Sequence, residues 1–224
     1  MSSFWAAPLE VMNEILRQVE ALPAASLACM SKLYFRHGAM NSGKSTALLQ
    51  VAFNYEERGQ TVALVKPAVD TKGDSKVVSR LGMVRQVDFL VLPSDNLRDQ
   101  IASHNSKLGR KIDCLLLDEA QFLTREQVDQ AMEIAVLDGI PVLAYGLRTD
   151  FLTNGFPGSI RLLEIAHSLE ELKTICRCGK KALFNARLKN GVFVFDGDQV
   201  AIDGEEVTYE SLCPNCYYGK LGKK

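Results

Sequence analysis

The sequence predicts an α/β fold: a three-layer domain on a mostly parallel sheet, followed by a smaller C-terminal domain. Three observations predict it. Short apolar runs alternate with amphipathic helical patterns from Leu33 to Tyr145, which is typical of parallel sheets covered by helices. A glycine-rich segment, residues 38–45, separates the first run from the first helix, and four cysteines lie near the C-terminus. We therefore expect an N-terminal helical extension (1–30), an α/β domain (31–171) and a metal-binding domain (172–224).

Composition excludes several classes of protein. The 224 residues are 47% hydrophobic and 24% charged, which suits a chain that buries its own core. A formal net charge of −1 gives no basic surface for duplex nucleic acid or an anionic membrane. No apolar run approaches the roughly 20 residues of a membrane span, and the N-terminus lacks a secretory pattern. We therefore expect a cytoplasmic protein with neither nucleic acid nor membrane as its partner.

The N-terminal extension has the pattern of an amphipathic helix from Trp5 to Leu22, with apolar residues at helical spacing. Three glutamates and one arginine argue against a mitochondrial transit peptide. We expect this helix to pack on the core or on a neighbouring subunit, and Pro23 to Ser31 to form a connector.

The first strand of the main domain, Leu33 to His37, leads into the spacing G-x-x-x-x-G-K-S of a P-loop. Its residues are Gly38, Ala39, Met40, Asn41, Ser42, Gly43, Lys44 and Ser45. Glycines let backbone N–H groups close around phosphate oxygens. Lys44 is expected to reach the β- and γ-phosphates of ATP and Ser45 to hold Mg²⁺. The alternative is a glycine turn without a nucleotide.

The next elements follow in the same alternation. A helix from Thr46 to Arg58 ends at Gly59, and a strand from Thr61 to Lys66 follows it. The polar, mixed-charge stretch Ala68 to Arg80 is expected to be a loop. A strand from Val87 to Leu92 and a helix capped by Ser94 and running toward Ser106 come next.

A buried strand from Ile112 to Leu117 delivers Asp118, Glu119, Ala120 and Gln121 to the carboxyl edge of the sheet, where such folds place ligand chemistry. Asp118 is positioned to hold Mg²⁺ opposite Ser45. Glu119 is the candidate group to activate a nucleophile, either water in an ATPase or a substrate hydroxyl in a kinase. The alternative is that both acids cap the following helix.

The main domain closes with a helix introduced by the capping box Thr124 to Gln127 and ended by Gly139. A strand from Pro141 to Tyr145, a loop to Pro157 and a helix from about Gly158 to Ser168 follow. Together these elements predict right-handed crossovers between parallel strands.

From Thr174 onward, short β-type runs contain too little apolar material for a core of their own. Two pairs, Cys176-x-Cys178 and Cys213-x-x-Cys216, offer four thiolates, the ligand set of a closed structural zinc site in a zinc-ribbon-like domain. The alternative is four reduced cysteines without metal. Cys29 and Cys114 are expected to be ordinary small residues.

The motifs of this chain are, in order, the P-loop, the run Asp118 to Phe122, the run Tyr145 to Phe151 and the two cysteine pairs. The order of these motifs resembles that of the type II thymidine kinase family, in its bacterial form. The likeness covers roughly Lys32 to Gly219. It implies transfer of the γ-phosphoryl group of ATP to the 5′-hydroxyl of thymidine, to give dTMP in nucleotide salvage, and also phosphorylation of deoxyuridine. It also implies a homotetramer that is feedback-inhibited by dTTP.

The resemblance also implies roles for residues. Glu119 becomes the catalytic base, and the ATP and Mg²⁺ contacts fall on Gly38 to Ser45 and on Asp118 to Gln121. The substrate-side residues are Phe151, Tyr209 and a C-terminal lasso that closes over the thymine, made of Val200, Ala201, Ile202, Asp203 and Gly204. Arg80 or Arg148 is expected to offset phosphate charge.

This chain departs from the family pattern at three places. Its first cysteine pair is C-x-C rather than C-x-x-C, Lys72 stands where many members have arginine, and residues 1–30 have no counterpart in the family core. Two other classes of function compete. Asp-Glu-Ala-Gln also occurs in helicases, so a nucleic-acid-stimulated P-loop ATPase is the main alternative, although the chain is short for two motor lobes and lacks a basic surface. A zinc-ribbon interaction module and a kinase for another deoxynucleoside are further readings.

Overall fold

The structure is a computed structural model that describes residues 31–68, 75–197, 199 and 207–222. Three segments discussed above lie outside these residues. They are the expected N-terminal helix, part of the stretch after Ala68 that includes Asp70 and Lys72, and the lasso Val200 to Gly204.

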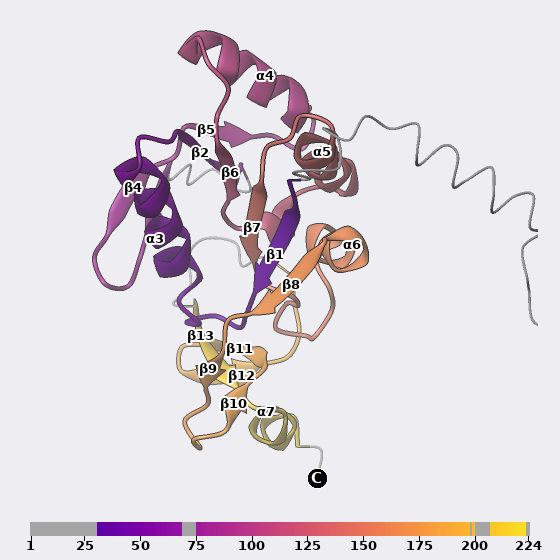
Figure 1. Ribbon diagram of the computed structural model, residues 1–224. Helices are drawn as coiled ribbons and strands as arrows, with labels where there is room; N and C mark the ends of the chain where they lie inside the picture. The colour runs from indigo at the N-terminus through magenta and orange to yellow at the C-terminus, as the bar shows by residue number, and fades with distance from the viewer. Residues whose placement is uncertain (1–30, 69–74, 198, 200–206, 223–224) are drawn as a thin grey trace, which may run out of the picture. The chain divides into compact units, whose positions relative to one another are not determined.

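The centre of the described chain is a six-stranded sheet in the order β5-β2-β6-β7-β1-β8 (Figure 1). Every neighbouring pair in it is parallel, so the predicted parallel sheet is confirmed. Its strands are β1 (Leu33–His37), β2 (Val62–Pro67), β5 (Phe89–Val91), β6 (Cys114–Leu117), β7 (Val142–Gly146) and β8 (Ser168–Glu171).

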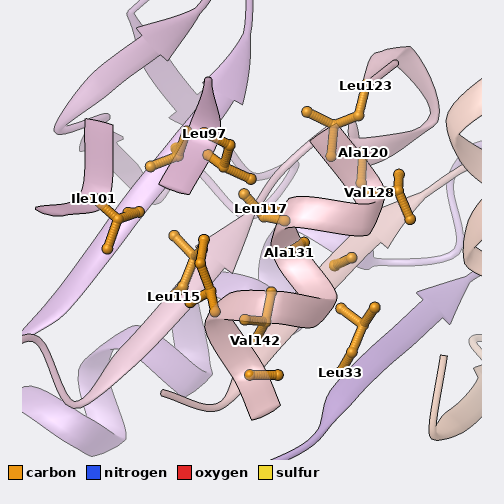
Figure 2. Packing of buried hydrophobic residues seen from close by; sticks show 14 of the residues in the cluster. Leu33, Leu97, Ile101, Leu115, Leu117, Ala120, Leu123, Val128, Ala131 and Val142 are labelled. Carbon is orange, nitrogen blue, oxygen red and sulfur yellow. The ribbon is translucent and has the colours of Figure 1, made fainter. Parts of the chain in front are cut away.

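Helices cover both faces of the sheet, which gives the predicted three layers (Figure 1). They are α3 (Lys44–Glu57) on one face and α4 (Leu97–Leu108), α5 (Arg125–Val136) and α6 (Pro157–Ile165) on the other. Side chains of a strand alternate between faces. In β6, Leu116 therefore packs toward α3, while Leu115 and Leu117 pack toward α4 and α5 (Figure 2).

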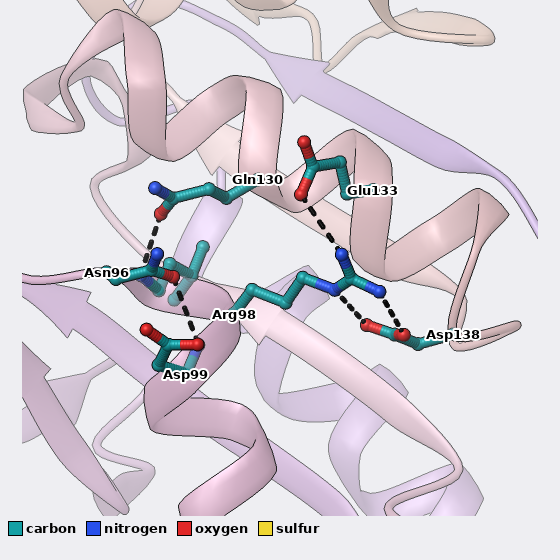
Figure 3. A network of polar contacts seen from close by, with 7 residues as sticks. Asn96, Arg98, Asp99, Gln130, Glu133 and Asp138 are labelled. Atoms are coloured by element: carbon teal, nitrogen blue, oxygen red, sulfur yellow. Dashed lines mark hydrogen bonds and ion pairs between the residues drawn. The ribbon is translucent and has the colours of Figure 1, made fainter.

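The ends of two helices test the predicted caps. The capping box is confirmed, since Thr124 accepts from the Gln127 N–H and the Gln127 side chain accepts from the Thr124 N–H. The predicted cap Ser94 is wrong: it lies in a turn, and α4 starts after Asn96, whose side chain accepts from the Asp99 N–H (Figure 3). The cause is tertiary, because α5 fixes the start of α4 through a bond from the Leu97 N–H to Gln130.

Two β segments were not predicted. The chain forms a hairpin that begins within the loop expected from Ala68 to Arg80 and continues beyond it, with strands β3 (Lys76–Val78) and β4 (Val84–Gln86). An ion pair from Arg85 to Glu56 ties the hairpin to α3. The last helix of the main domain ends at Ile165 rather than Ser168, because Ser168 begins β8 and pairs with β1.

The remaining elements form what we call the C-terminal subdomain. They are β9 (Thr174–Ile175), β10 (Lys181–Ala182), β11 (Phe184–Lys189), β12 (Val192–Val194), β13 (Val207–Leu212) and α7 (Pro214–Lys220). Strand β11 lies between β12 and β13, and β9 pairs with β10. Its buried cluster is small and includes Cys176 and Cys213, in agreement with the expectation that this part depends on its cysteines.

Candidate active site

The glycine-rich loop joins β1 to α3, as predicted. A Cβ atom at Gly38 would lie 2.4 Å from the carbonyl oxygen of Leu172, so no larger residue fits there. Gly43, at the N-cap of α3, has φ of 81°, a conformation that L side chains rarely adopt. Asn41 is also left-handed, with φ of 65°. These residues turn the loop so that it enters the N-terminus of α3, where an anion is favoured.

Lys44 folds back over this loop. Its Nζ donates to the carbonyl oxygens of Ala39 (3.0 Å) and Gly38 (3.4 Å). Burial lowers the pKa of Lys44, while the charges of Glu119 and Asp118 act in the opposite direction. The ammonium group therefore contacts the loop and feels the charges of both acids.

A cavity of about 720 Å³ opens over the loop, in the size range of small-molecule sites. It brings together the loop, the candidate base and the unpredicted hairpin. Its lining consists of Met40, Asn41, Ser42, Gly43, Lys44, Ser45, Thr46, Ala47, Gln50, Val78, Arg80, Leu81, Glu119, Leu147 and Leu172.

The two acids at the end of β6 differ in their surroundings. Asp118 is buried, and burial together with the charge of Glu119 raises the pKa of Asp118 to about 7. Glu119 is partly exposed and has φ of 50°, an unusual conformation for a residue with a side chain. It occupies the N-cap of η1 (Ala120–Phe122), but its side chain makes no capping hydrogen bond, so the capping alternative lacks support.

Ala120 and Gln121 follow these acids and are fully buried. The Gln121 side chain accepts from the Leu147 N–H (3.0 Å) and donates through Nε2 to Glu119. Gln121 therefore links Glu119 to the end of β7, and it presents no side-chain surface to a nucleotide.

The two arginines considered for phosphate charge lie in different places. Arg80, beyond the end of β3, lines the large cavity. Arg148 instead lines a small pocket with His37, and its charge adds to burial in lowering the pKa of His37.

The predicted substrate-side residues Phe151 and Tyr209 meet around a residue that was not predicted, Arg187 of β11. Its guanidinium carbon is 3.6 Å from the centroid of the Phe151 ring, and its Nε donates to the Tyr209 hydroxyl (3.1 Å). Arg187 also donates to the carbonyl oxygen of Gln199 (3.0 Å). A lone arginine in a β-type run gives no local signal for such a role.

A second group around Phe151 was also missed. The Gln199 side chain donates to the buried Asp150 (3.2 Å), and the Tyr217 hydroxyl donates to the Phe151 carbonyl oxygen (2.7 Å). Asp150 is thereby joined to Gln199, and the adjacent Phe151 is joined to α7.

The four predicted metal ligands come together. The sulfur atoms of Cys176, Cys178, Cys213 and Cys216 all lie within 4.8 Å of one another. Around zinc, ~2.3 Å Zn–S bonds in a tetrahedron place sulfurs about 3.8 Å apart, and the Sγ atoms of Cys178 and Cys213 are 3.5 Å apart. The cluster fits structural zinc, and the C-x-C spacing still brings both sulfurs to it.

A parallel sheet with a glycine-rich loop between β1 and α3, and an acid, Glu119, that lines the same cavity as the loop, defines a P-loop nucleotide-binding protein. The family described as thymidine kinase matches residues 31–217. The chain belongs to the thymidine kinase family, and it is an ATP-dependent kinase that phosphorylates thymidine.

Curated relatives agree over most of their length. A thymidine kinase of Legionella pneumophila (strain Paris) is 50% identical over 198 residues, 87% of this chain and 93% of the relative. A thymidine kinase of Aliivibrio fischeri is 47% identical over 196 residues, 87% of this chain and 100% of the relative. The nucleic-acid-stimulated ATPase is therefore not favoured.

Among solved structures, the crystal structure of the Pif1 helicase from Candida albicans aligns with a TM-score of 0.37 at 16% identity, over 78% of this chain and 41% of that one. This likeness is too weak to bear on function. None of the described helices combines the length and apolar character needed to cross a membrane.

Proposed function

We propose that Glu119 is the general base for transfer of the γ-phosphoryl group of ATP to the 5′-hydroxyl of thymidine. The observation that carries the proposal is the shared cavity, in which Glu119 and Lys44 line the same space over the loop. A base must reach the hydroxyl proton while the phosphates are held in line, and this arrangement suits both requirements.

On the donor side, backbone N–H groups from Gly38 to Ser45 bind the phosphates, and Lys44 moves from the carbonyl oxygens of the loop to the β- and γ-phosphates. Ser45 and Asp118 would hold Mg²⁺, which would neutralise phosphate charge when bound. A nearby cation favours the ionised form of a carboxyl group, so bound Mg²⁺ would lower the raised pKa of Asp118. Arg80 is the further cation on the cavity wall.

Gln121 supports the base rather than the nucleotide. Its hydrogen bond to Glu119 holds the carboxylate, and its bond to the Leu147 N–H fixes its own amide. The Gln121 side chain therefore positions Glu119, and the ATP contacts that the family resemblance implies for Ala120 and Gln121 stay a prediction.

On the acceptor side, Phe151, Tyr209 and the lasso Val200 to Gly204 hold the base of thymidine or deoxyuridine. Arg187 supports this proposal, because it fixes Phe151 and Tyr209 and binds the chain at Gln199, directly before the lasso. A neutral planar base is well held between an aromatic ring and backbone donors.

The chain is organised as a kinase domain (31–171) and a zinc-binding lasso domain (172–224), with the extension 1–30 in front. Zinc on the four cysteines is structural, because four thiolates leave no open position for a reacting water. Family membership supports a homotetramer inhibited by dTTP. A metal-ligand set of four cysteines, which needs thiols rather than disulfides, supports a cytoplasmic location.

The test is a phosphorylation assay with the purified full chain, ATP, Mg²⁺ and a panel of nucleosides. We expect dTMP from thymidine and dUMP from deoxyuridine, with little product from purine nucleosides. ATP hydrolysis that needs no nucleoside and is stimulated by DNA would contradict the proposal.

A further inference from the structure

The outer turn of the phosphate-binding loop is fastened to the C-terminal subdomain by three side chains. The Met40 N–H donates to Oδ1 of Asn185 (2.7 Å), and the Ser211 hydroxyl donates to the Met40 carbonyl oxygen. The Thr174 hydroxyl donates to the carbonyl oxygen of Asn41 (3.3 Å). Both backbone groups of Met40 are therefore held by residues far along the chain.

The two side chains on Met40 come from one rung of a sheet. Asn185 of β11 and Ser211 of β13 are register partners, and they are 3% and 7% exposed. The Asn185 amide also donates to the carbonyl oxygen of Thr149 (3.3 Å). Buried polar groups favour the one arrangement in which each has a partner. A buried donor or acceptor left unpaired costs more free energy than a hydrogen bond contributes.

We call Asn185, Ser211 and Thr174 the clamp, and two of the three strands that carry it, β9 and β13, end at cysteines of the cluster. Strand β9 ends at Ile175, directly before Cys176, and β13 ends at Leu212, directly before Cys213. Thr174 and Ser211 are each two residues from a cysteine of the cluster. A metal on the four sulfurs would therefore fix the strand ends from which two of the three clamp residues project.

We propose that Asn185, Ser211 and Thr174 are positioning residues for the phosphate-binding loop, and that through them the metal site and the nucleotide site are energetically coupled. The proposal rests on the nucleotide-binding function of the loop. The clamp preorganises a turn that contains the left-handed Asn41, so less free energy is spent on ordering it when phosphates bind. Coupling between two binding sites is reciprocal, so nucleotide must in turn stabilise the metal site.

The first experiment measures equilibrium binding of MgADP to the purified, metal-loaded full chain. Asn185→Ala and Ser211→Ala are each expected to weaken ADP binding about tenfold, the effect of losing one buried hydrogen bond. The metal content should stay unchanged. Thr208→Ala, at an exposed position of β13, is the control and should bind ADP like the wild type.

If the substitutions at the buried Asn185 and Ser211 prevent folding, two variants at the half-exposed Thr174 test the same role. Thr174→Val removes the hydroxyl and should weaken ADP binding several-fold, whereas Thr174→Ser keeps the hydroxyl and should retain affinity. ADP affinity unchanged in all clamp variants would overturn the positioning role.

The second experiment follows transfer of metal from the protein to a coloured chelator, with and without saturating ADP. At equilibrium the wild type should retain a larger share of the metal with ADP than without it, and the Asn185→Ala/Ser211→Ala double variant should lose this protection. A merely structural role predicts equal protection in both proteins, which would overturn the coupling. A wild type that fails to bind ADP at all would instead contradict the proposed function of the loop.

Discussion

The guanidinium of Arg187 lies 3.6 Å from the centroid of the Phe151 ring and donates to the hydroxyl of Tyr209. Arg187 is 6% exposed, so its charge is desolvated and its contact with the ring is correspondingly strong. This one side chain thereby sets the positions of both aromatic residues assigned to the acceptor side. It also donates to the carbonyl oxygen of Gln199, the residue before the proposed lasso.

Arg187→Lys is expected to raise the KM for thymidine about tenfold, because an ammonium group cannot stack on Phe151 while bonding Tyr209 and Gln199. The KM for ATP should stay within a factor of two to three of the wild type, because these contacts lie outside the cavity lining. Initial-rate kinetics with each substrate varied provides the measurement. Lys107→Met, an exposed cation on α4, is the control. Equal changes in both KM values would contradict the assignment.

Gln121→Leu keeps the volume of the buried side chain and removes its two hydrogen bonds. We expect kcat to fall about tenfold, because Glu119 loses its support, and the free energy of unfolding to fall by about 1–3 kcal/mol, because the Leu147 N–H is left unpaired. Steady-state kinetics and urea unfolding measure the two effects. Gln60→Leu, at an exposed position, should change neither. A normal kcat in Gln121→Leu would show that Glu119 needs no such support.

Asp118→Asn should stabilise the metal-free protein at pH 8 while it abolishes magnesium-dependent activity. Burial raises the pKa of Asp118 to about 7 in the folded chain, against about 4 when unfolded. The folded state therefore holds an extra proton between these values, and this carboxyl group lowers stability as the pH rises from 4 to 7. Replacing Asp118 by asparagine removes this pH-dependent loss of stability.

The measurement is the midpoint temperature of thermal unfolding. The buffer contains a chelator that binds Mg²⁺ but is too weak to remove zinc from the protein. At pH 8 the variant should unfold about 2–6 °C above the wild type, and the gap should narrow toward pH 4.5. A gap that is absent at pH 8, or that widens on acidification, would contradict the raised pKa.

Removal of metal should unfold the C-terminal subdomain, because its own apolar cluster is small. The purified wild type should contain about one zinc per chain, from the four-thiolate set. Cys213→Ser should lose the metal and bind neither thymidine nor ADP tightly, and Cys29→Ser should retain all three properties. Metal analysis and ligand binding provide the readouts. A wild type free of zinc, with all four thiols of the cluster open to titration, would contradict the site.

Local patterns in the sequence predicted local structure well. The Thr124 capping box depends on residues three positions apart, and β6 is an uninterrupted apolar run, so each is visible in a short window. Strand β8 was missed because it pairs with β1 alone at the sheet edge and therefore has the polar sequence Ser-Leu-Glu-Glu. The helix start at Asn96 was missed because a distant side chain, Gln130, selects it.

The candidate site divides in the same way. The loop, the acid pair and the cysteines were found because each function needs a fixed spacing. Asn185 and Arg187 were missed because their partners Met40 and Phe151 are distant in the chain, and an isolated polar residue in a strand carries no sign of its contact. Such residues become visible only when the strands are assembled.

The central claim, that Glu119 activates the 5′-hydroxyl of thymidine, is tested most directly by kcat for dTMP formation in Glu119→Gln. The amide preserves the size of the side chain and removes its basicity, so kcat should fall about 10²–10⁴-fold while the dissociation constant of MgADP stays near the wild-type value. A fully active Glu119→Gln would contradict the claim.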